Sequence, residues 1–150
     1  MKNNLRTRII SALVMSTVVM TAAPASAITS PTYEKQVLDR VNVKRVDRDR
    51  VPLKYQTCVD RYAERQAAWM ASHRVLRHQK LGPVLDACNL RGVAENIAYG
   101  YTSGNAVVSA WMRSTGHRAN LINSRMRYSG VGAAQDKNGV WWVAQVYGRK

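Results

Sequence analysis

The sequence predicts an α+β fold: a three-layer α-β-α sandwich around a central, mostly antiparallel sheet. Helical patterns come first along the chain and strand patterns come last, with mixed segments between them, an order typical of α+β domains. The last strand pattern, residues 140–148, is apolar on both faces, so we expect it inside a sheet covered on both sides. A turn at residues 136–139 joins it to a second strand at residues 128–135, and its Asn138-Gly139 pair indicates a hairpin.

Two amphipathic helices are predicted in the first half of the chain. One runs from Tyr33 to about Arg48, and Pro52 marks its end because proline disfavours helix at the residue before it. The second opens at Thr57, where Thr57 to Asp60 matches a capping box, and its apolar stripe continues to Met70. We expect these two helices to form one cover layer.

The middle of the chain holds shorter elements. Residues 73–92 are mixed, with a short helix over 82–89, and residues 97–99 resemble a strand that ends in a glycine-rich turn. A short helix with a broad apolar face covers residues 107–112. Residues 114–116 then break this helix, and Ser114 offers a hydroxyl cap to a second helix that begins near His117.

The N-terminus has the pattern of an export signal. A basic start, an apolar run and the small residues Ala25-Ser26-Ala27 predict a secretory signal peptide over residues 1–27. An uncleaved membrane anchor is the alternative. We therefore expect a lead-in at 28–32 and one domain at 33–150, secreted to the extracellular space or associated with the cell envelope, with no membrane span after cleavage.

The charge balance is strongly basic. The chain has 23 Lys and Arg against nine Asp and Glu, and removal of the predicted signal leaves 20 against nine, a net charge of +11. For an exported domain this predicts attraction to an anionic cell-wall polymer or lipid. No standard nucleic-acid motif is present, so we expect no nucleic-acid partner. The alternative is a solvated basic surface, which we expect for the mixed-sign run from Lys44 to Arg50.

The chain has two cysteines, Cys58 and Cys88. In an exported protein an even count favours a disulfide bond, with two buried free thiols as the alternative. The chain contains no Cys-x-x-Cys pair, which argues against a metal site built from thiolates.

Several short motifs together resemble the CAP superfamily, also called the SCP domain, which includes the cysteine-rich secretory proteins, antigen 5 and the plant pathogenesis-related proteins. The likeness is greatest to its compact bacterial secreted branch. Ordered along the chain, the motifs are Ala94-Glu95-Asn96-Ile97-Ala98, Ala110-Trp111-Met112, Gly116-His117-Arg118-Ala119-Asn120-Leu121, Gly130-Val131-Gly132 and the Trp-rich final strand. The resemblance implies an α-β-α sandwich, in agreement with the fold predicted from the patterns above.

The resemblance also implies a cavity lined by two histidines and two acidic residues, which holds a divalent metal in several members. Glu95 and His117 match one acidic residue and one histidine of that set, and His78 is our match for the other histidine; its neighbour His73 is expected to be exposed. The second acidic residue is missing, because Arg113 and Ser114 follow Trp111-Met112. The candidate cavity or metal site is therefore His78, Glu95 and His117.

This set has two interpretations. Two imidazoles and one carboxylate can serve as zinc ligands and leave a fourth position for water, which would support a zinc-dependent hydrolase. Alternatively, Glu95 is a structural carboxylate that accepts backbone N–H bonds, and His117 is a polar residue at a helix start. Ser114 has no support as a nucleophile beyond its closeness to His117, and the chain has no Gly-x-Ser-x-Gly elbow.

The sequence favours a non-enzymatic binding module, a monomer that requires no cofactor and binds a lipid or other apolar ligand, or an anionic envelope component. The resemblance implies lipid or sterol binding in some members. The alternatives are the zinc-dependent hydrolase, for which zinc or another divalent metal would be the cofactor, and a structural component of an envelope or spore.

Overall fold

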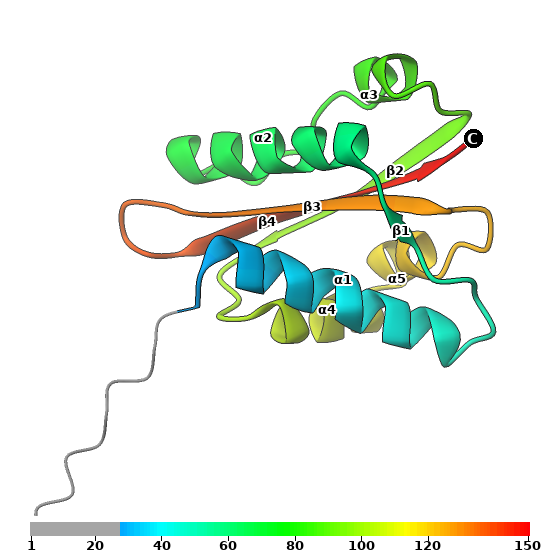
Figure 1. Cartoon of the computed structure of the whole chain (residues 1–150). Helices are drawn as coiled ribbons and strands as arrows, with labels where there is room; N and C mark the ends of the chain where they lie inside the picture. The colour runs from blue at the N-terminus through cyan, green and yellow to red at the C-terminus, as the bar shows by residue number, and fades with distance from the viewer. Residues whose placement is uncertain (1–27) are drawn as a thin grey trace, which may run out of the picture.

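A four-stranded mixed sheet separates two layers of helices (Figure 1). The computed structural model describes residues 28–150, so the predicted signal peptide lies outside the described residues. The sheet order is β1-β3-β4-β2, formed by β1 (Lys54–Tyr55), β3 (Tyr128–Gln135), β4 (Trp141–Arg149) and β2 (Gly92–Tyr99). Among the described strands, only the β1–β3 pairing is parallel. The predicted α+β class and mostly antiparallel sheet are confirmed.

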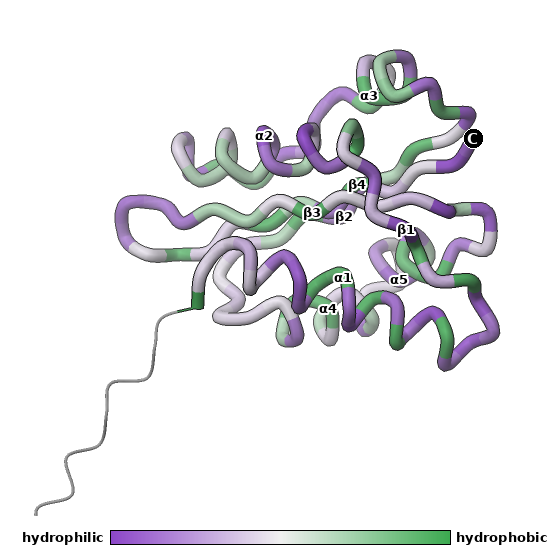
Figure 2. The backbone as a smooth tube through the Cα atoms, in the orientation of Figure 1, coloured by the Kyte–Doolittle hydropathy of each residue, from purple (hydrophilic) through white to green (hydrophobic). Residues whose placement is uncertain are grey.

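Strand β4 occupies the interior of the sheet, as its two apolar faces predict. It pairs with β3 on one side and β2 on the other, and Trp141 to Gly148 are all buried. The predicted hairpin is present: the Asp136 carboxylate accepts the N–H groups of Asn138 and Val140 at 2.9 and 3.0 Å, and Gly139 has a φ of +76°. Figure 2 shows this turn as a hydrophilic end between two more hydrophobic strands.

The two long helices, α1 (Ser30–Val46) and α2 (Thr57–His73), lie on opposite faces of the sheet (Figure 1). The expectation that they form one layer is wrong. Helix α2 packs on β3 and β4, whereas α1 packs on β3 and on α4 (Gly104–Arg113). An apolar stripe shows that a helix has a buried side and gives no information on which sheet face receives it. The chain changes face through β1, which at two residues is too short to be recognised by its periodicity.

The ends of these helices differ from the predicted ones. Helix α1 begins at Ser30, inside the predicted lead-in, because Pro31 fits the first turn, where its missing N–H is not needed. The N-cap of α2 is Gln56, whose side chain accepts the Val59 N–H at 2.7 Å, so the capping box predicted at Thr57 is wrong. Asp60 instead accepts the N–H of Val131 on β3 at 3.0 Å.

Helix α2 approaches β3 unusually closely because β3 carries two glycines. A Cβ atom added to Gly130 would lie 2.1 Å from the Cα of Asp60, and one added to Gly132 would lie 2.3 Å from the Cα of Glu64. Any larger residue at either position would collide with helix backbone, which cannot move aside cheaply. The Gly130-Val131-Gly132 motif therefore serves helix–sheet contact.

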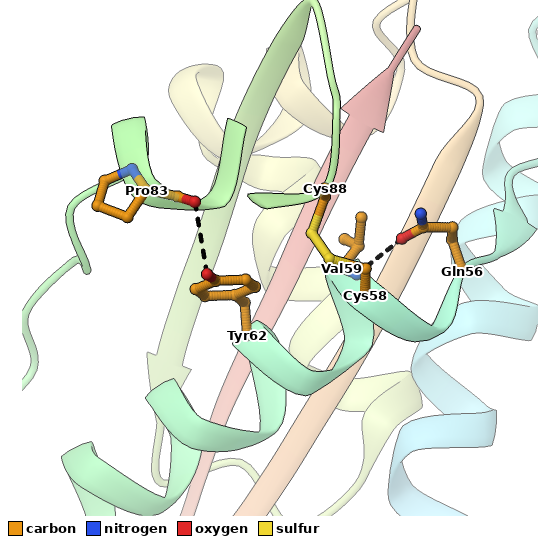
Figure 3. The surroundings of a disulfide bond; sticks show 6 residues. All are labelled: Gln56, Cys58, Val59, Tyr62, Pro83 and Cys88. Carbon is orange, nitrogen blue, oxygen red and sulfur yellow. Dashed lines mark hydrogen bonds between the residues drawn. A yellow bond between two sulfur atoms is a disulfide. The ribbon is translucent and has the colours of Figure 1, made fainter. Parts of the chain in front are cut away.

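The predicted disulfide between Cys58 and Cys88 is present and joins α2 to the end of α3 (Gly82–Ala87) (Figure 3). Beside it, the Tyr62 hydroxyl donates to the Pro83 carbonyl at 3.4 Å (Figure 3). The bridge therefore holds a short helix against the outer part of the α2 layer.

Helix α5 (Thr115–Leu121) follows α4 after one residue, Ser114. Ser114 occupies the N-cap position, yet its side chain makes no capping bond, so the predicted hydroxyl cap is wrong. The helix begins at Thr115, which places His117 within its first turn.

Arg45 is buried, although the sequence led us to expect it on the surface. We expected the run from Lys44 to Arg50 to be solvated, but Arg45 is fully buried. Its guanidinium donates to four carbonyl groups: Val51 at 2.9 Å, Leu121 at 2.8 Å, Asn123 at 3.0 Å and Met126 at 3.1 Å. Arg45 thereby ties the end of α1 to the end of α5 and to the loop before β3.

No helix within residues 28–150 has the length and apolar character needed to cross a membrane.

Candidate functional site

Glu95 lies in the middle of β2, opposite Val146 of β4. The sequence placed it before an apolar strand, but the strand begins earlier, at Gly92, and includes it. Its side chain is fully buried. Since a buried carboxylate is costly unless its oxygens are bonded, the groups that bond it define the site.

Both oxygens of Glu95 are bonded by the loop that precedes α3. His78 Nδ1 lies 2.7 Å from Oε1, and the Gln79 side-chain amide donates to Oε2 at 2.6 Å. The backbone N–H of Gln79 also donates to Oε1, at 3.3 Å. Glu95 therefore fixes this loop against the sheet, which is the structural role we considered for it, and it also orients one imidazole.

The loop is held from the α2 side as well. The Gln79 amide donates to the Tyr62 carbonyl at 3.4 Å, and the Gln66 side chain donates to the Arg77 carbonyl. Sequence reasoning missed Gln79 as a site residue; its place beside His78 was the one signal available. The imidazole of His78 itself remains largely open, with 57% of its side chain exposed.

His117 lies on the other side of β2, on α5. Its backbone carbonyl accepts the Asn96 side-chain amide at 3.0 Å, and Asn120 donates to Asn96 Oδ1 at 3.0 Å and to the Glu95 carbonyl at 3.2 Å. These bonds position α5 against β2. Asn96 and Asn120 stand inside the motifs quoted above, but sequence reasoning gave them no role.

The Asn96 amide continues into the sheet. It donates to the Tyr147 hydroxyl at 3.0 Å, which donates to Gln145 Oε1 at 2.7 Å; Gln145 in turn donates to Ser129 Oγ at 3.0 Å. Burial raises the pKa of Tyr147 far above its ordinary value, so this hydroxyl stays protonated. The chain of bonds fixes the position of the His117 backbone.

His117 is one of the residues that line a cleft of about 300 Å³. The indole of Trp111, 1% exposed, lies near it, with the two ring centres 6.3 Å apart. Burial lowers the pKa of His117, and its electrostatic interaction with His78 lowers it further. Both effects favour the neutral form of the imidazole, which suits an apolar cleft.

The cleft is mostly apolar. Its rim carries two unusually exposed apolar side chains, Leu76 at 46% and Tyr99 at 52%. The residues that line it come from β2, α4, the start of α5 and two loops: Leu76, Ile97, Ala98, Tyr99, Tyr101, Ala110, Trp111, Ser114 and His117.

The structure brings His78 and Glu95 into direct contact and places His117 across the edge strand from them. It does not arrange the three as a metal centre: His78 and Gln79 take the Glu95 oxygens. Within the part of the chain that the structure describes, no three His, Cys, Asp or Glu side chains are placed to hold a metal ion. The residues as placed therefore do not fit the divalent metal that the family resemblance implies.

His73, expected to be exposed, is exposed and stacks on Trp69.

Comparison with known proteins agrees with this architecture. The model of the cysteine-rich secretory protein family, CAP, matches residues 38–147. The uncharacterized protein YkwD of Bacillus subtilis (strain 168) is 31% identical over 136 residues, which cover 86% of this chain and 51% of YkwD. The chain thus spans about half the length of that relative.

Two solved structures share the fold. An extracellular protein containing an SCP domain from Bacillus anthracis str. Ames has a TM-score of 0.73 and 24% identity, over 81% of this chain and 41% of the other. An outer surface protein from Borrelia burgdorferi has a TM-score of 0.69 and 20% identity, over 77% of this chain and 91% of the other.

Proposed function

The chain belongs to the cysteine-rich secretory protein family, CAP, and from that premise we propose that it is a non-enzymatic, exported binding module that holds an apolar chain in the cleft beside His117. The observation that carries the proposal is the cleft itself, with its apolar lining and its exposed rim at Leu76 and Tyr99. A concave, mostly apolar pocket with a few polar groups is the usual form of a small-molecule site.

The size of the cleft favours one class of ligand. At about 300 Å³ it lies at the lower end of the roughly 300–1,000 Å³ that ligand pockets occupy. A single acyl chain fits this volume better than a two-chain lipid. The neutral imidazole of His117 can donate to or accept from one polar end group, which would fix the orientation of the chain.

The test is binding of a fluorescent single-chain fatty acid to the chain from residue 28 onward. Ala110→Phe would fill the cleft and should abolish binding. Ala106→Phe lies one helical turn earlier on α4, outside the residues that line the cleft, and should leave binding unchanged. Equal affinity in wild type and Ala110→Phe would overturn the proposal.

Attraction to an anionic envelope component is a second part of the proposal, and the basic net charge of residues 28–150 supports it. Exposed charges are screened within about 8 Å at physiological salt. Binding to isolated envelope material should therefore fall steeply as salt rises. Binding that does not change with salt would remove this part and leave the apolar cleft.

The alternative is a zinc-dependent hydrolase with His78, Glu95 and His117, which would have to rearrange because as placed they do not fit a metal. One observation favours it: Glu95 orients the His78 imidazole through Nδ1 and leaves Nε2 without a bond to any described residue. This alternative needs zinc in equimolar amount in the purified protein and loss of zinc on His117→Ala. The binding module should instead keep its fatty acid after this substitution. Metal analysis and fatty-acid binding on the same two proteins separate the alternatives.

A further inference from the structure

The outer side of α2, together with the loop that follows it, carries a second feature away from the cleft. Four exposed basic residues line the depressions there: Arg61, Arg65, Arg77 and Lys80. Within residues 28–150 none of the four forms an ion pair with a carboxylate. Glu64 borders Arg61 and Arg65 without pairing with either. We call these four residues the α2 basic surface.

Two of the arginines lie over aromatic rings. The Arg65 guanidinium lies 4.3 Å from the centre of the Tyr62 ring, and the Arg77 guanidinium lies 4.3 Å from the centre of the Trp69 ring. His73 stacks on Trp69 at 4.3 Å. Stacking fixes the plane of a guanidinium and leaves its N–H groups, which lie in that plane, available for an anion.

These N–H groups have no acceptor in the described part of the chain, and the backbone under Arg77 is fixed by the Gln66 side chain. Less conformational entropy is then lost when an anion binds, because the donors are already oriented. Lysines on a solvated face would not have this property. The surface also includes two depressions, of about 380 and 470 Å³, one beside Arg61 and Arg65 and one beside Arg77 and Lys80.

The spacing of the two stacked arginines indicates the kind of partner. Tyr62 and Trp69 are seven residues apart on one helix, which is about 10 Å along its axis. Because each guanidinium lies over one of these rings, we expect the two groups to be separated on the same scale, which suits a chain with repeated phosphates better than a single phosphate. The second depression also includes the open imidazole of His78, which can bond a hydroxyl group.

We propose that the α2 basic surface binds a phosphodiester polymer with a polyol or sugar backbone, through Arg65 and Arg77 as two separate phosphate contacts. This inference deepens the envelope-binding part of the proposed function and rests on it. It does not depend on the apolar cleft, which is lined by other residues.

The experiment measures binding of the chain from residue 28 onward to purified poly(glycerol phosphate) at two salt concentrations. The double variant Arg65→Gln/Arg77→Gln should bind about 10-fold more weakly or worse, since even one lost charge-assisted bond is worth that factor. The control Arg113→Gln/Arg125→Gln makes the same change in net charge at exposed positions outside the α2 layer and should bind within about twofold of wild type.

A second pair of measurements tests geometry against charge alone. Arg65→Lys/Arg77→Lys keeps the charge and loses the planar donors, and it should bind more weakly than wild type. Monomeric glycerol phosphate should compete poorly, and polyglutamate of equal charge should bind more weakly than the phosphodiester polymer.

The outcomes separate the two levels of the proposal. No binding of the wild type at low salt would remove the envelope-binding function itself. Binding that falls equally in the Arg65/Arg77 and Arg113/Arg125 variants would keep that function and overturn this surface. Equal binding by the lysine variant, equal binding of polyglutamate, or full competition by the monomer would overturn the two-contact phosphate recognition.

Discussion

Replacing Arg45 by methionine should destabilise the fold by about 3 kcal/mol. Two of its four bonds, those to the carbonyls of Leu121 and Met126, are buried, and each of these groups would lose its donor at a cost of about 2 kcal/mol. The acceptors on Val51 and Asn123 are only partly buried and can bind water instead. About 1 kcal/mol returns because methionine does not bury a charge.

The measurement is urea unfolding followed by circular dichroism, with the midpoint and the slope fitted separately. For a domain of this size a loss of about 3 kcal/mol corresponds to a fall in Tm of roughly 12 °C. Arg48→Met is the control: Arg48 is exposed, three residues further on, and its side chain bonds only the Lys44 carbonyl among the described residues. A loss below about 1 kcal/mol in Arg45→Met, or an equal loss in the control, would refute the argument.

Three further predictions concern stability. Burial raises the pKa of Glu34 to about 7; the N–H of Ala133 opposes this shift, and Asp60 and Glu64 assist it. The stability that protonated Glu34 contributes is fully present below about pH 4.5 and is lost as the pH rises through 7, because the half-buried carboxyl group then ionises. Glu34→Gln should therefore stabilise the protein by about 1 kcal/mol at pH 8, a value reduced for its partial exposure, and change little at pH 4; equal effects at both pH values would contradict this. Cys58→Ala/Cys88→Ala should cost about 3 to 4 kcal/mol in chemical unfolding, and a reductant should lower the stability of wild type alone. Gly132→Ala should cost about 3 kcal/mol because of the collision with α2, whereas Gly116→Ala, with open space around it, should fold normally; similar melting temperatures for the two would count against the close approach.

The sheet could be predicted from the sequence because its signals are local. The two apolar faces of residues 140–148 place that strand inside the sheet, and Asp136 to Gly139 specify the hairpin through one carboxylate and one positive φ. The disulfide could be predicted because the chain has only two cysteines.

What the sequence did not reveal depends on contacts between distant segments. The burial of Arg45 needs four carbonyls supplied by two loops and the end of α5, and three of these lie more than 70 residues away. The faces occupied by α1 and α2 depend on β1, which is too short to show a pattern. No spacing rule indicates that His117 lies on the other side of β2 from His78 and Glu95. That arrangement follows from the alternation of side chains along β2, where Glu95 bonds His78 and the next residue, Asn96, bonds the His117 carbonyl.

The sequence therefore identified some residues of the candidate site and missed others. The motifs drew attention to Glu95 and His117. Asn96 and Asn120, which hold α5 in place, stand inside the same motifs but were given no role, and Gln79, which holds the loop, lies outside them. An apolar ligand was expected from the sequence, but the residues that line the cleft could not be predicted, since they come from five separate segments of the chain.

Photochemical labelling tests the binding proposal most directly. A fatty acid with a photoreactive group at the end of its chain would be bound, irradiated and located by peptide mass spectrometry. We expect the label in peptides that contain Tyr99 to Trp111, and we expect Ala110→Phe to remove it. Labelling confined to α2 or spread evenly over the protein, unchanged by Ala110→Phe, would contradict the proposal that the cleft beside His117 is the ligand site.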